Sequence, residues 1–161
     1  MLGPDHADDV GTPSERAVMN GIVIYESLTG NTKAAGHIIA DELTAAGVET
    51  IACPITAVDL QALSDADLVV VGSWTDGVFF FGQRPGRAGR LAGKLPRIDG
   101  KKAVVYCTYA LDCGGTLDKL ARIVRMGGGD VVGGYAIKRD DLFGGSKELV
   151  DRLLSALDAT V

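Results

Sequence analysis

The hexapeptide Ser27–Thr32, which reads SLTGNT, is the segment of this chain best suited to hold a ligand. Four of its side chains carry a hydroxyl or an amide, and its one glycine permits a tight turn. It lies between an apolar run, Gly21–Tyr25, and a predicted helix over Thr32–Gly47. The first N–H groups of a helix have no intrahelical partner and carry partial positive charge, so such a loop can bind a phosphate without Lys or Arg.

We therefore predict a site for a phosphate monoester in this loop. Its predicted residues are Ser27, Leu28, Thr29, Gly30, Asn31 and Thr32. The alternative is a simple helix N-cap, for which one Ser, Thr or Asn is enough. Four such residues within six, directly after an apolar strand, exceed what capping requires.

The elements that must position this loop alternate between strands and helices. The predicted strands, which are mostly continuous apolar runs, are Gly21–Tyr25, Val48–Cys53, Asp67–Gly72, Lys101–Cys107 and Asp130–Lys138. The predicted helices are Thr32–Gly47, Val58–Leu63, Arg87–Lys94, Thr116–Met126 and Ser146–Leu157. This alternation predicts the α/β class, with a doubly wound five-stranded parallel sheet in a three-layer α/β/α arrangement.

Ligands of such sheets bind beyond the carboxyl ends of the strands, where the strand order reverses. The connections after the third and fourth strands therefore matter as much as the hexapeptide. The first of them holds the only tryptophan, which either covers a local core or offers a platform for a flat aromatic ligand. The candidate residues there are Ser73, Trp74, Thr75, Asp76 and Gly77. Those of the other loop are Thr108, Tyr109, Ala110, Asp112, Cys113 and Gly114.

Composition narrows the function classes further. Of the 161 residues, 47% are apolar and 23% charged, as in ordinary globular domains, and no apolar run approaches the length of a membrane span. The net charge of −5 argues against nucleic acid as a partner and is compatible with docking onto basic protein surfaces. Three cysteines without CxxC spacing predict neither a disulfide framework nor a structural zinc site.

We expect two regions in the chain: a flexible N-terminal leader over residues 1–19 and a single domain over residues 20–161. The leader is rich in Asp and Pro and has no apolar segment of the signal-peptide type. A cytoplasmic location and a monomeric state are the corresponding expectations.

From residue 20 to the C-terminus the sequence resembles the flavodoxins of the short-chain type, which bind FMN and carry electrons. The most specific part of the resemblance is Ile24–Thr32, which looks like the phosphate-loop signature of that family. It implies that the polar side chains of the hexapeptide bind the phosphate of FMN. It also implies that the Trp74 loop covers one face of the isoalloxazine, and that the Thr108–Ala110 loop flanks the other face and bonds its pyrimidine edge through backbone groups.

The chain departs from the family pattern at several positions. Trp74 comes earlier in this loop than the tryptophan of the well-known members. Those members often have glycine directly after the tryptophan, whereas here the next glycine is Gly77. The family needs a small, flexible residue in this part of the loop, beside N5 of the flavin. Tyr109 also lies earlier than the stacking tyrosine. Gly36 stands where the family usually has alanine, a packing change expected to cost ~1 kcal/mol in helix propensity.

The resemblance implies no general acid or base, so no catalytic residue is predicted. The cofactor would carry the electrons, while the protein sets its potential and access. Packing between Trp74 and Tyr109, in a chain of net charge −5, disfavours an anionic reduced flavin and favours one-electron exchange. Asp76 and Asp112 are assigned electrostatic roles only.

A second unusual segment follows the tryptophan loop. Three adjacent rings, Phe79–Phe81, cannot all face one core in extended chain, so at least one is predicted to be exposed as a lid or docking patch. Arg84, Arg87 and Arg90 recur every three residues and would form a positive stripe on a helix. The stripe is interpreted either as a solvated face or as a determinant of partner choice, lying beyond reach of the phosphate.

The sequence therefore predicts an FMN-binding protein that shuttles single electrons between redox partner proteins, a reductase and an acceptor. One alternative is an FMN-dependent quinone or NAD(P)H oxidoreductase of the same fold, although no Gly-x-Gly-x-x-Gly motif is present. Another is a flavodoxin-like interaction module without flavin. A phosphoacceptor receiver module needs clustered carboxylates after the first strand, where only Glu26 is found.

Overall fold

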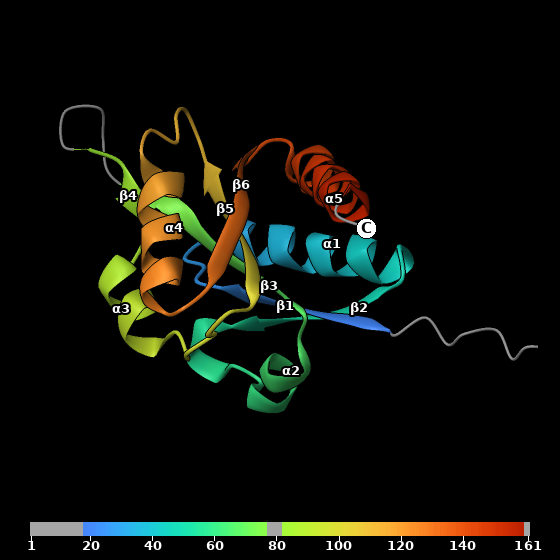
Figure 1. Cartoon of the computed structure of the whole chain (residues 1–161). Coiled ribbons are helices and arrows are strands. Elements are labelled where there is room, and N and C mark those ends of the chain that lie inside the picture. Colours follow the sequence, from blue (N-terminus) through green and yellow to red (C-terminus); the bar gives the residue numbers. More distant parts are fainter. Residues whose placement is uncertain (1–17, 77–81, 160–161) are drawn as a thin grey trace, which may run out of the picture.

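The computed structural model describes residues 18–76 and 82–159 and contains a single sheet with helices on both sides (Figure 1). The strands are β1 (Met19–Tyr25), β2 (Val48–Pro54), β3 (Leu68–Asp76), β4 (Arg84–Pro85), β5 (Lys102–Tyr109) and β6 (Asp130–Lys138). The helices are α1 (Asn31–Ala45), the 3₁₀ turn η1 (Ile55–Ala57), α2 (Leu60–Asp65), α3 (Ala88–Lys94), α4 (Thr116–Met126) and α5 (Leu142–Asp158).

Five strands form a parallel sheet in the order β2-β1-β3-β5-β6, and the two-residue β4 adds an antiparallel edge to the end of β3. The predicted doubly wound five-stranded parallel sheet is thereby confirmed. The strand order reverses between β1 and β3, so the loops that follow these two strands border the switch point.

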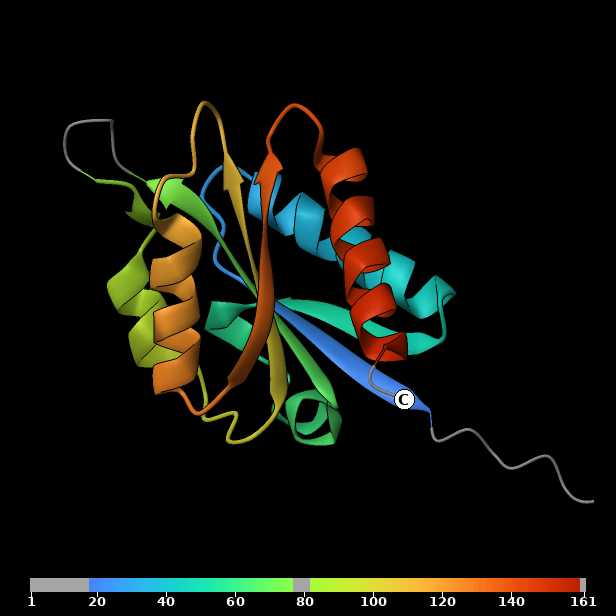
Figure 2. The ribbon, with the colours of Figure 1, turned by 45° about the horizontal axis from the view of Figure 1, so that its top comes forward.

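Helices cover both faces of the sheet and give three layers (Figure 2). Two hydrophobic cores form the contacts between these layers. One lies against α1 and α5, and the other lies against α2, α3 and α4. In β1, Val23 faces the first core while Ile22 and Ile24 face the second, because successive side chains of a strand point to opposite faces. All three are fully buried, as expected for a central strand covered on both sides.

Tyr106, at the centre of β5, is the largest of the fully buried side chains. A Cβ atom at Gly72 would lie 2.0 Å from its ring, and one at Gly36 would lie 2.7 Å from its hydroxyl. The departure at Gly36 therefore has a packing reason, since the missing methyl leaves room for this tyrosine. The same hydroxyl donates a hydrogen bond of 2.8 Å to the Thr32 carbonyl at the start of α1.

The observed elements differ from the predicted ones mainly at their ends. β3 continues to Asp76 rather than ending at Gly72, because Trp74 pairs with Thr108 of β5 on one side while β4 pairs with Thr75 and Asp76 on the other. α5 begins at Leu142, capped by the Asp141 side chain, four residues before the predicted start. Most of the predicted leader lies outside the described residues. Within the described part, no helix is both long and apolar enough to cross a membrane.

Candidate functional site

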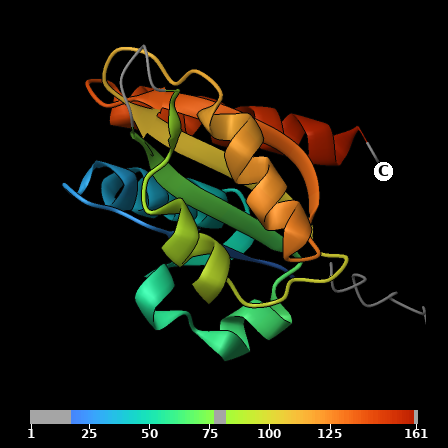
Figure 3. The same cartoon turned by 90° about the vertical axis from the view of Figure 1, so that its left-hand side faces the viewer.

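The loops predicted to bind a ligand all lie at the carboxyl edge of the sheet. In Figure 2 the arrowheads of β3, β5 and β6 point to the same end of the molecule, and the turn from β1 into α1 lies at that end as well. Figure 3 shows this edge from another side, with α3 and α4 beside it. Parallel strands thus bring together three segments that are far apart in the sequence.

The hexapeptide forms a tight turn at the N-terminus of α1. Gly30 is its N-cap, with a φ of 98°, a conformation that L side chains rarely adopt. The Ser27 hydroxyl accepts hydrogen bonds of 3.2 Å from the Gly30 and Lys33 N–H groups. Leu28 and Thr29 are exposed at the tip of the turn, and Asn31 is half-buried. The loop is accordingly both capped internally and open to solvent on its outer side.

Thr32 connects this loop to the third one. Its side chain is buried, and its Oγ1 lies 2.8 Å from the Oγ1 of Thr108 near the end of β5. The two hydroxyls form a hydrogen bond, so one lone pair or proton of each is already used within the protein. The structure therefore brings the first and third predicted segments into direct contact.

The tryptophan segment is a strand end and not a free loop. The Gly86 N–H donates a 2.7 Å bond to the Trp74 carbonyl, and the fully buried Ser73 hydroxyl donates a 3.0 Å bond to the Gly86 carbonyl. A Cβ atom at Gly86 would fall 1.8 Å from the indole, so the ring packs directly on this glycine. One side of the half-buried Trp74 is thus covered by its own chain, which agrees with the core-covering interpretation for that side.

Of the two remaining described residues of this segment, Asp76 is exposed, whereas the Thr75 hydroxyl is buried. The Asp76 carboxylate lies 3.8 Å from the Arg84 guanidinium, and both side chains are about half exposed. Thr75 is half-buried within the strand. Gly77, which the sequence placed in the site, lies outside the described residues, as do Phe79–Phe81.

The third segment begins as a strand and continues as a turn. Thr108 and Tyr109 belong to β5, and the Tyr109 carbonyl accepts a 2.9 Å bond from the Arg139 N–H. The exposed turn starts at the half-buried Ala110. Asp112 caps it by accepting from the Gly114 N–H at 3.1 Å.

Gln83, just before β4, contacts this turn. Its amide donates to the Asp112 carboxylate at 3.4 Å, and its side chain occupies the space that a Cβ at Gly114 would need. The Gly114 φ of 49° also favours glycine. The half-buried Cys113 follows Asp112, and burial raises the pKa of the neighbouring Cys107 thiol to about 12.

Two of the three stripe arginines bind a residue that the sequence analysis did not place in the site. Glu26, directly before the hexapeptide, is buried and accepts hydrogen bonds from Arg87 and Arg90. The three arginines do not share one helix, because Arg84 lies in β4, and the other two pair with this carboxylate. An acidic residue at the end of a buried apolar strand was the available signal, since a buried carboxylate needs a cationic partner.

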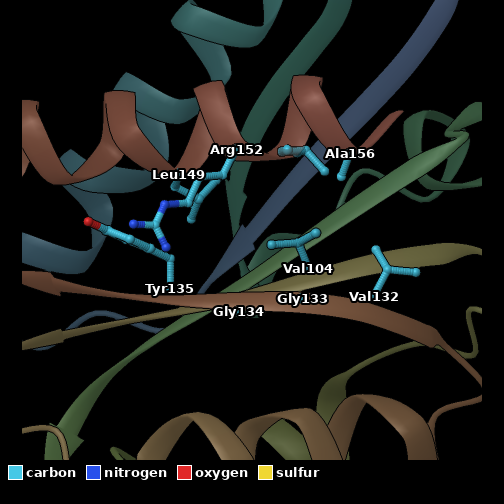
Figure 4. Close-up of a pocket in the computed structure, with 9 residues that line it drawn as sticks. Val104, Val132, Gly133, Gly134, Tyr135, Leu149, Arg152 and Ala156 are labelled. Carbon is cyan, nitrogen blue, oxygen red and sulfur yellow. The ribbon is translucent and has the colours of Figure 1, made fainter. Parts of the chain in front are cut away.

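A separate cavity of about 230 Å³ lies between β6 and α5 (Figure 4). Gly133 and Gly134 leave it open, and Arg152 lies over the Tyr135 ring at 5.1 Å from the centroid. Its walls come from the middle of the strands and of α5 rather than from the strand ends. It is therefore distinct from the edge where the three segments meet.

Fold and site together define a doubly wound α/β protein with a hydroxyl-rich turn at the N-terminus of its first helix. The sequence profile of the flavodoxin domain matches residues 22–115, which is more than half of the chain. The protein belongs to the flavodoxin family, as the resemblance predicted. At the level of the family, this is a class of flavin-binding electron carriers.

Solved structures agree on the fold. Flavodoxin 2 from Bacillus cereus, in the oxidised state, has a TM-score of 0.67 at 22% identity, covering 85% of this chain and 99% of its own. Two-electron reduced flavodoxin from Megasphaera elsdenii has a TM-score of 0.61 at 24% identity, covering 81% and 95%. The flavodoxin of Streptococcus pneumoniae has a TM-score of 0.64 at 18% identity, covering 85% and 99%. A search of curated protein sequences gave no match.

The residues present fit the phosphate end of an FMN molecule. The turn offers neutral hydroxyl and N–H groups at a helix N-terminus, the donor set that suits a phosphate. At Gly30, an added Cβ would meet no atom within 4 Å, so the chain leaves open space beside the turn. Half-buried aromatic side chains, Trp74 and Tyr109, stand at the ends of the two neighbouring strands.

Proposed function

We propose that this protein binds FMN at the carboxyl edge of its sheet and carries single electrons between redox partner proteins. The observation that supports this most is the contact between Thr32 and Thr108, which joins the phosphate turn to the third segment. Membership of the flavodoxin family supports the same cofactor. When bound, FMN supplies the redox chemistry, and the protein supplies binding, orientation and control of access.

The residues of this chain have separate roles in the proposal. The hexapeptide Ser27–Thr32 binds the phosphate through hydroxyl and N–H groups. Trp74 and Tyr109 flank the flavin ring and keep water from it, while Asp76 and Asp112 add negative charge near its edge. No residue is assigned the transfer of a proton.

The cofactor assignment is tested by flavin titration. We expect one FMN per chain, with riboflavin bound much more weakly because it lacks the phosphate. Thr29→Val should weaken FMN by about ten- to hundredfold, since a hydrogen bond to a charged group is worth about 1.5–3 kcal/mol, and should leave riboflavin nearly unchanged. Thr29 is the cleaner choice because Thr32→Val would also break the bond to Thr108. Equal losses for both ligands would place the phosphate elsewhere.

Electron carriage is tested separately from binding. The FMN-loaded protein should accept electrons from a flavodoxin reductase and should not oxidise NAD(P)H by itself. Direct NAD(P)H or quinone turnover by the isolated protein would favour the enzyme alternative. A purified chain that binds neither FMN nor riboflavin would leave the interaction-module alternative.

A further inference from the structure

A cluster of the buried Glu26 and two partly exposed arginines, Arg87 and Arg90, lies between the phosphate turn and the tryptophan strand. The Glu26 carboxylate is only 2% exposed. It accepts bonds from Arg90 Nε at 2.7 Å and from a terminal nitrogen of Arg90 at 2.5 Å, a bidentate arrangement. Arg87 adds a third bond of 3.2 Å. The carboxylate is thus satisfied by two arginines from a segment more than sixty residues away.

The cluster carries an excess positive charge. The two hydrogen bonds from Arg90, and to a lesser extent the one from Arg87, lower the pKa of the Glu26 carboxyl although burial opposes the shift. The carboxylate is therefore ionised at neutral pH, and two guanidinium groups face one negative charge. The surplus of one positive charge lies on the arginines that bind Glu26, the residue that directly precedes the hexapeptide.

Arg87 also contacts the tryptophan. Its guanidinium carbon lies 5.7 Å from the centre of the Trp74 ring, within the range of a cation–π contact. Its backbone has a φ of 49°, and it is the one non-glycine residue of the described chain with a positive φ. A strained residue persists only where its surroundings fix it, and here Glu26 and Trp74 both do so.

Arg90 reaches toward the phosphate turn. Together with Glu26, Ser27, Gly30 and Lys33 it lines a cavity of about 300 Å³ beside the turn. The turn therefore has one cationic side chain, Arg90, on the flank where α3 approaches, in addition to its neutral donors and the exposed Lys33 of α1. The sequence alone suggested a turn without any such charge.

We propose that Glu26 is a positioning residue for phosphate recognition. By holding Arg87 and Arg90 in one place, it fixes the phosphate turn relative to Trp74 and keeps one surplus positive charge beside the turn. The terminal phosphate of FMN then binds to a turn whose conformation is fixed and whose electrostatic potential is positive. This inference depends on the proposed function, because it concerns how this chain prefers FMN over flavins without a terminal phosphate.

The test is the ratio of the riboflavin and FMN dissociation constants, measured by titration with each flavin. A residue that only supports the fold would change both constants together, whereas a residue that positions the phosphate turn changes the ratio. Glu26→Gln and Arg90→Gln should each weaken FMN by about tenfold or more, the loss expected for hydrogen bonds to charged groups, with little change for riboflavin. Arg90→Lys should behave like Arg90→Gln, because lysine keeps the charge but cannot form the paired bonds.

Arg84→Gln is the matched control. Arg84 belongs to the same segment and loses the same charge, but it is 57% exposed and pairs with Asp76 instead of Glu26. The ratio of the riboflavin and FMN dissociation constants should be the same for this variant as for the unmodified protein. Should Glu26→Gln not fold, as judged by circular dichroism, the Glu26→Gln/Arg90→Gln double variant keeps a neutral pair at the site and should show the same lowered ratio.

Three results would overturn the inference. An unchanged ratio in folded Glu26 and Arg90 variants would reduce the cluster to an anchor for α3. Full FMN affinity in Arg90→Lys would show that charge alone is enough and that positioning by Glu26 is not needed. An unmodified protein that binds neither flavin would overturn both this inference and the proposed function. In the first two cases the proposed function still stands, provided that the unmodified protein prefers FMN over riboflavin.

Discussion

Tyr106 occupies a volume that two glycines leave open, and this fit determines the position of α1. The ring lies against Gly72, and the hydroxyl lies against Gly36 while donating to the Thr32 carbonyl. The first turn of α1 carries the proposed phosphate site, so a core residue positions a candidate functional one. The sequence revealed Gly36 only as a departure from the family, because a single chain does not say which distant side chain fills the space left by a glycine.

Gly72→Ala should therefore destabilise the protein strongly. The new methyl would have to share space with the Tyr106 ring, and overpacking of a filled core typically costs about 1–3 kcal/mol. Chemical unfolding of the flavin-free protein measures the change. Gly93→Ala, in α3 with no atom near the added methyl, is the control and should stabilise by about 0.5–1 kcal/mol through helix propensity. Equal stability of both variants would contradict the packing argument.

Trp74 is a second case in which one residue decides the shape of the site. If its free side faces the flavin ring, Trp74→Ala should weaken FMN by about 1–3 kcal/mol, the range for flat bases stacked on aromatic side chains. The fluorescence of this single tryptophan should also be quenched by FMN and recover on its removal. An unchanged FMN affinity would mean that the indole only covers the local core and does not contact the flavin.

At the scale of the elements, β3 and the short β4 form a hairpin that carries the tryptophan. Local sequence predicted the buried part of β3, since Leu68–Val71 is a continuous apolar run. It did not predict the extension to Asp76, because that part depends on pairing with Arg84 and Pro85 across an intervening segment. Elements that show a hydrophobic pattern in their own sequence were predictable. Elements that form only by pairing with a segment far along the chain were not.

Gly86→Ala tests the hairpin directly. The added methyl would overlap the indole, so the ring has to move away from β4 or the hairpin has to open. We expect a red shift in Trp74 emission in the flavin-free protein, since the ring becomes more exposed to water. Gly89→Ala, three residues further along with open space around the methyl, should leave the emission unchanged. An unshifted spectrum in Gly86→Ala would mean that the indole does not rest on this glycine in solution.

At the scale of the whole molecule, the parallel topology gathers three distant segments at one edge of the sheet. The parallel sheet followed from the alternation of strands and helices, so the sequence predicted that the loops after the first, third and fourth parallel strands lie at one edge. The strand order itself was not predicted, because alternation alone does not determine it. The sequence did not predict the Glu26–Arg87 and Glu26–Arg90 contacts, because ion pairs between distant segments leave no local pattern. The predicted partner-facing role of the arginine segment is thereby left to Arg84, which is exposed.

Arg84→Glu should alter electron transfer with a redox partner protein without altering FMN affinity. The chain has a net charge of −5, and exposed charges steer encounters in a manner that salt screens. We expect the difference in transfer rate between the variant and the unmodified protein to shrink as ionic strength rises. Stopped-flow kinetics at several salt concentrations measures it. A rate that is identical at low salt would make Arg84 part of an ordinary solvated face.

The stability of the whole domain should fall on the alkaline side. Burial raises the pKa of Tyr25, Cys53 and Tyr106, and it raises that of the Cys107 thiol to about 12 from an ordinary value of 9.0. Between these two pH values the folded state keeps a proton on Cys107 that the unfolded chain releases, so the unfolded state binds fewer protons. Stability from this thiol is therefore complete below about pH 9 and is lost progressively as pH rises toward 12.

Urea unfolding of the flavin-free protein at about pH 8 and about pH 10.5 brackets the start of this loss. Cys107→Ala lowers stability at both values by opening a small cavity, but it should make the difference between them smaller, because the buried thiol no longer titrates on unfolding. Cys113→Ala is the comparison variant: it removes a thiol that contributes to the raised pKa of Cys107 less than burial does, so most of the difference should be retained. If Cys107→Ala keeps the full difference as well, the alkaline loss comes from the buried tyrosines or from Cys53, and the Cys107 thiol is not held protonated by the core.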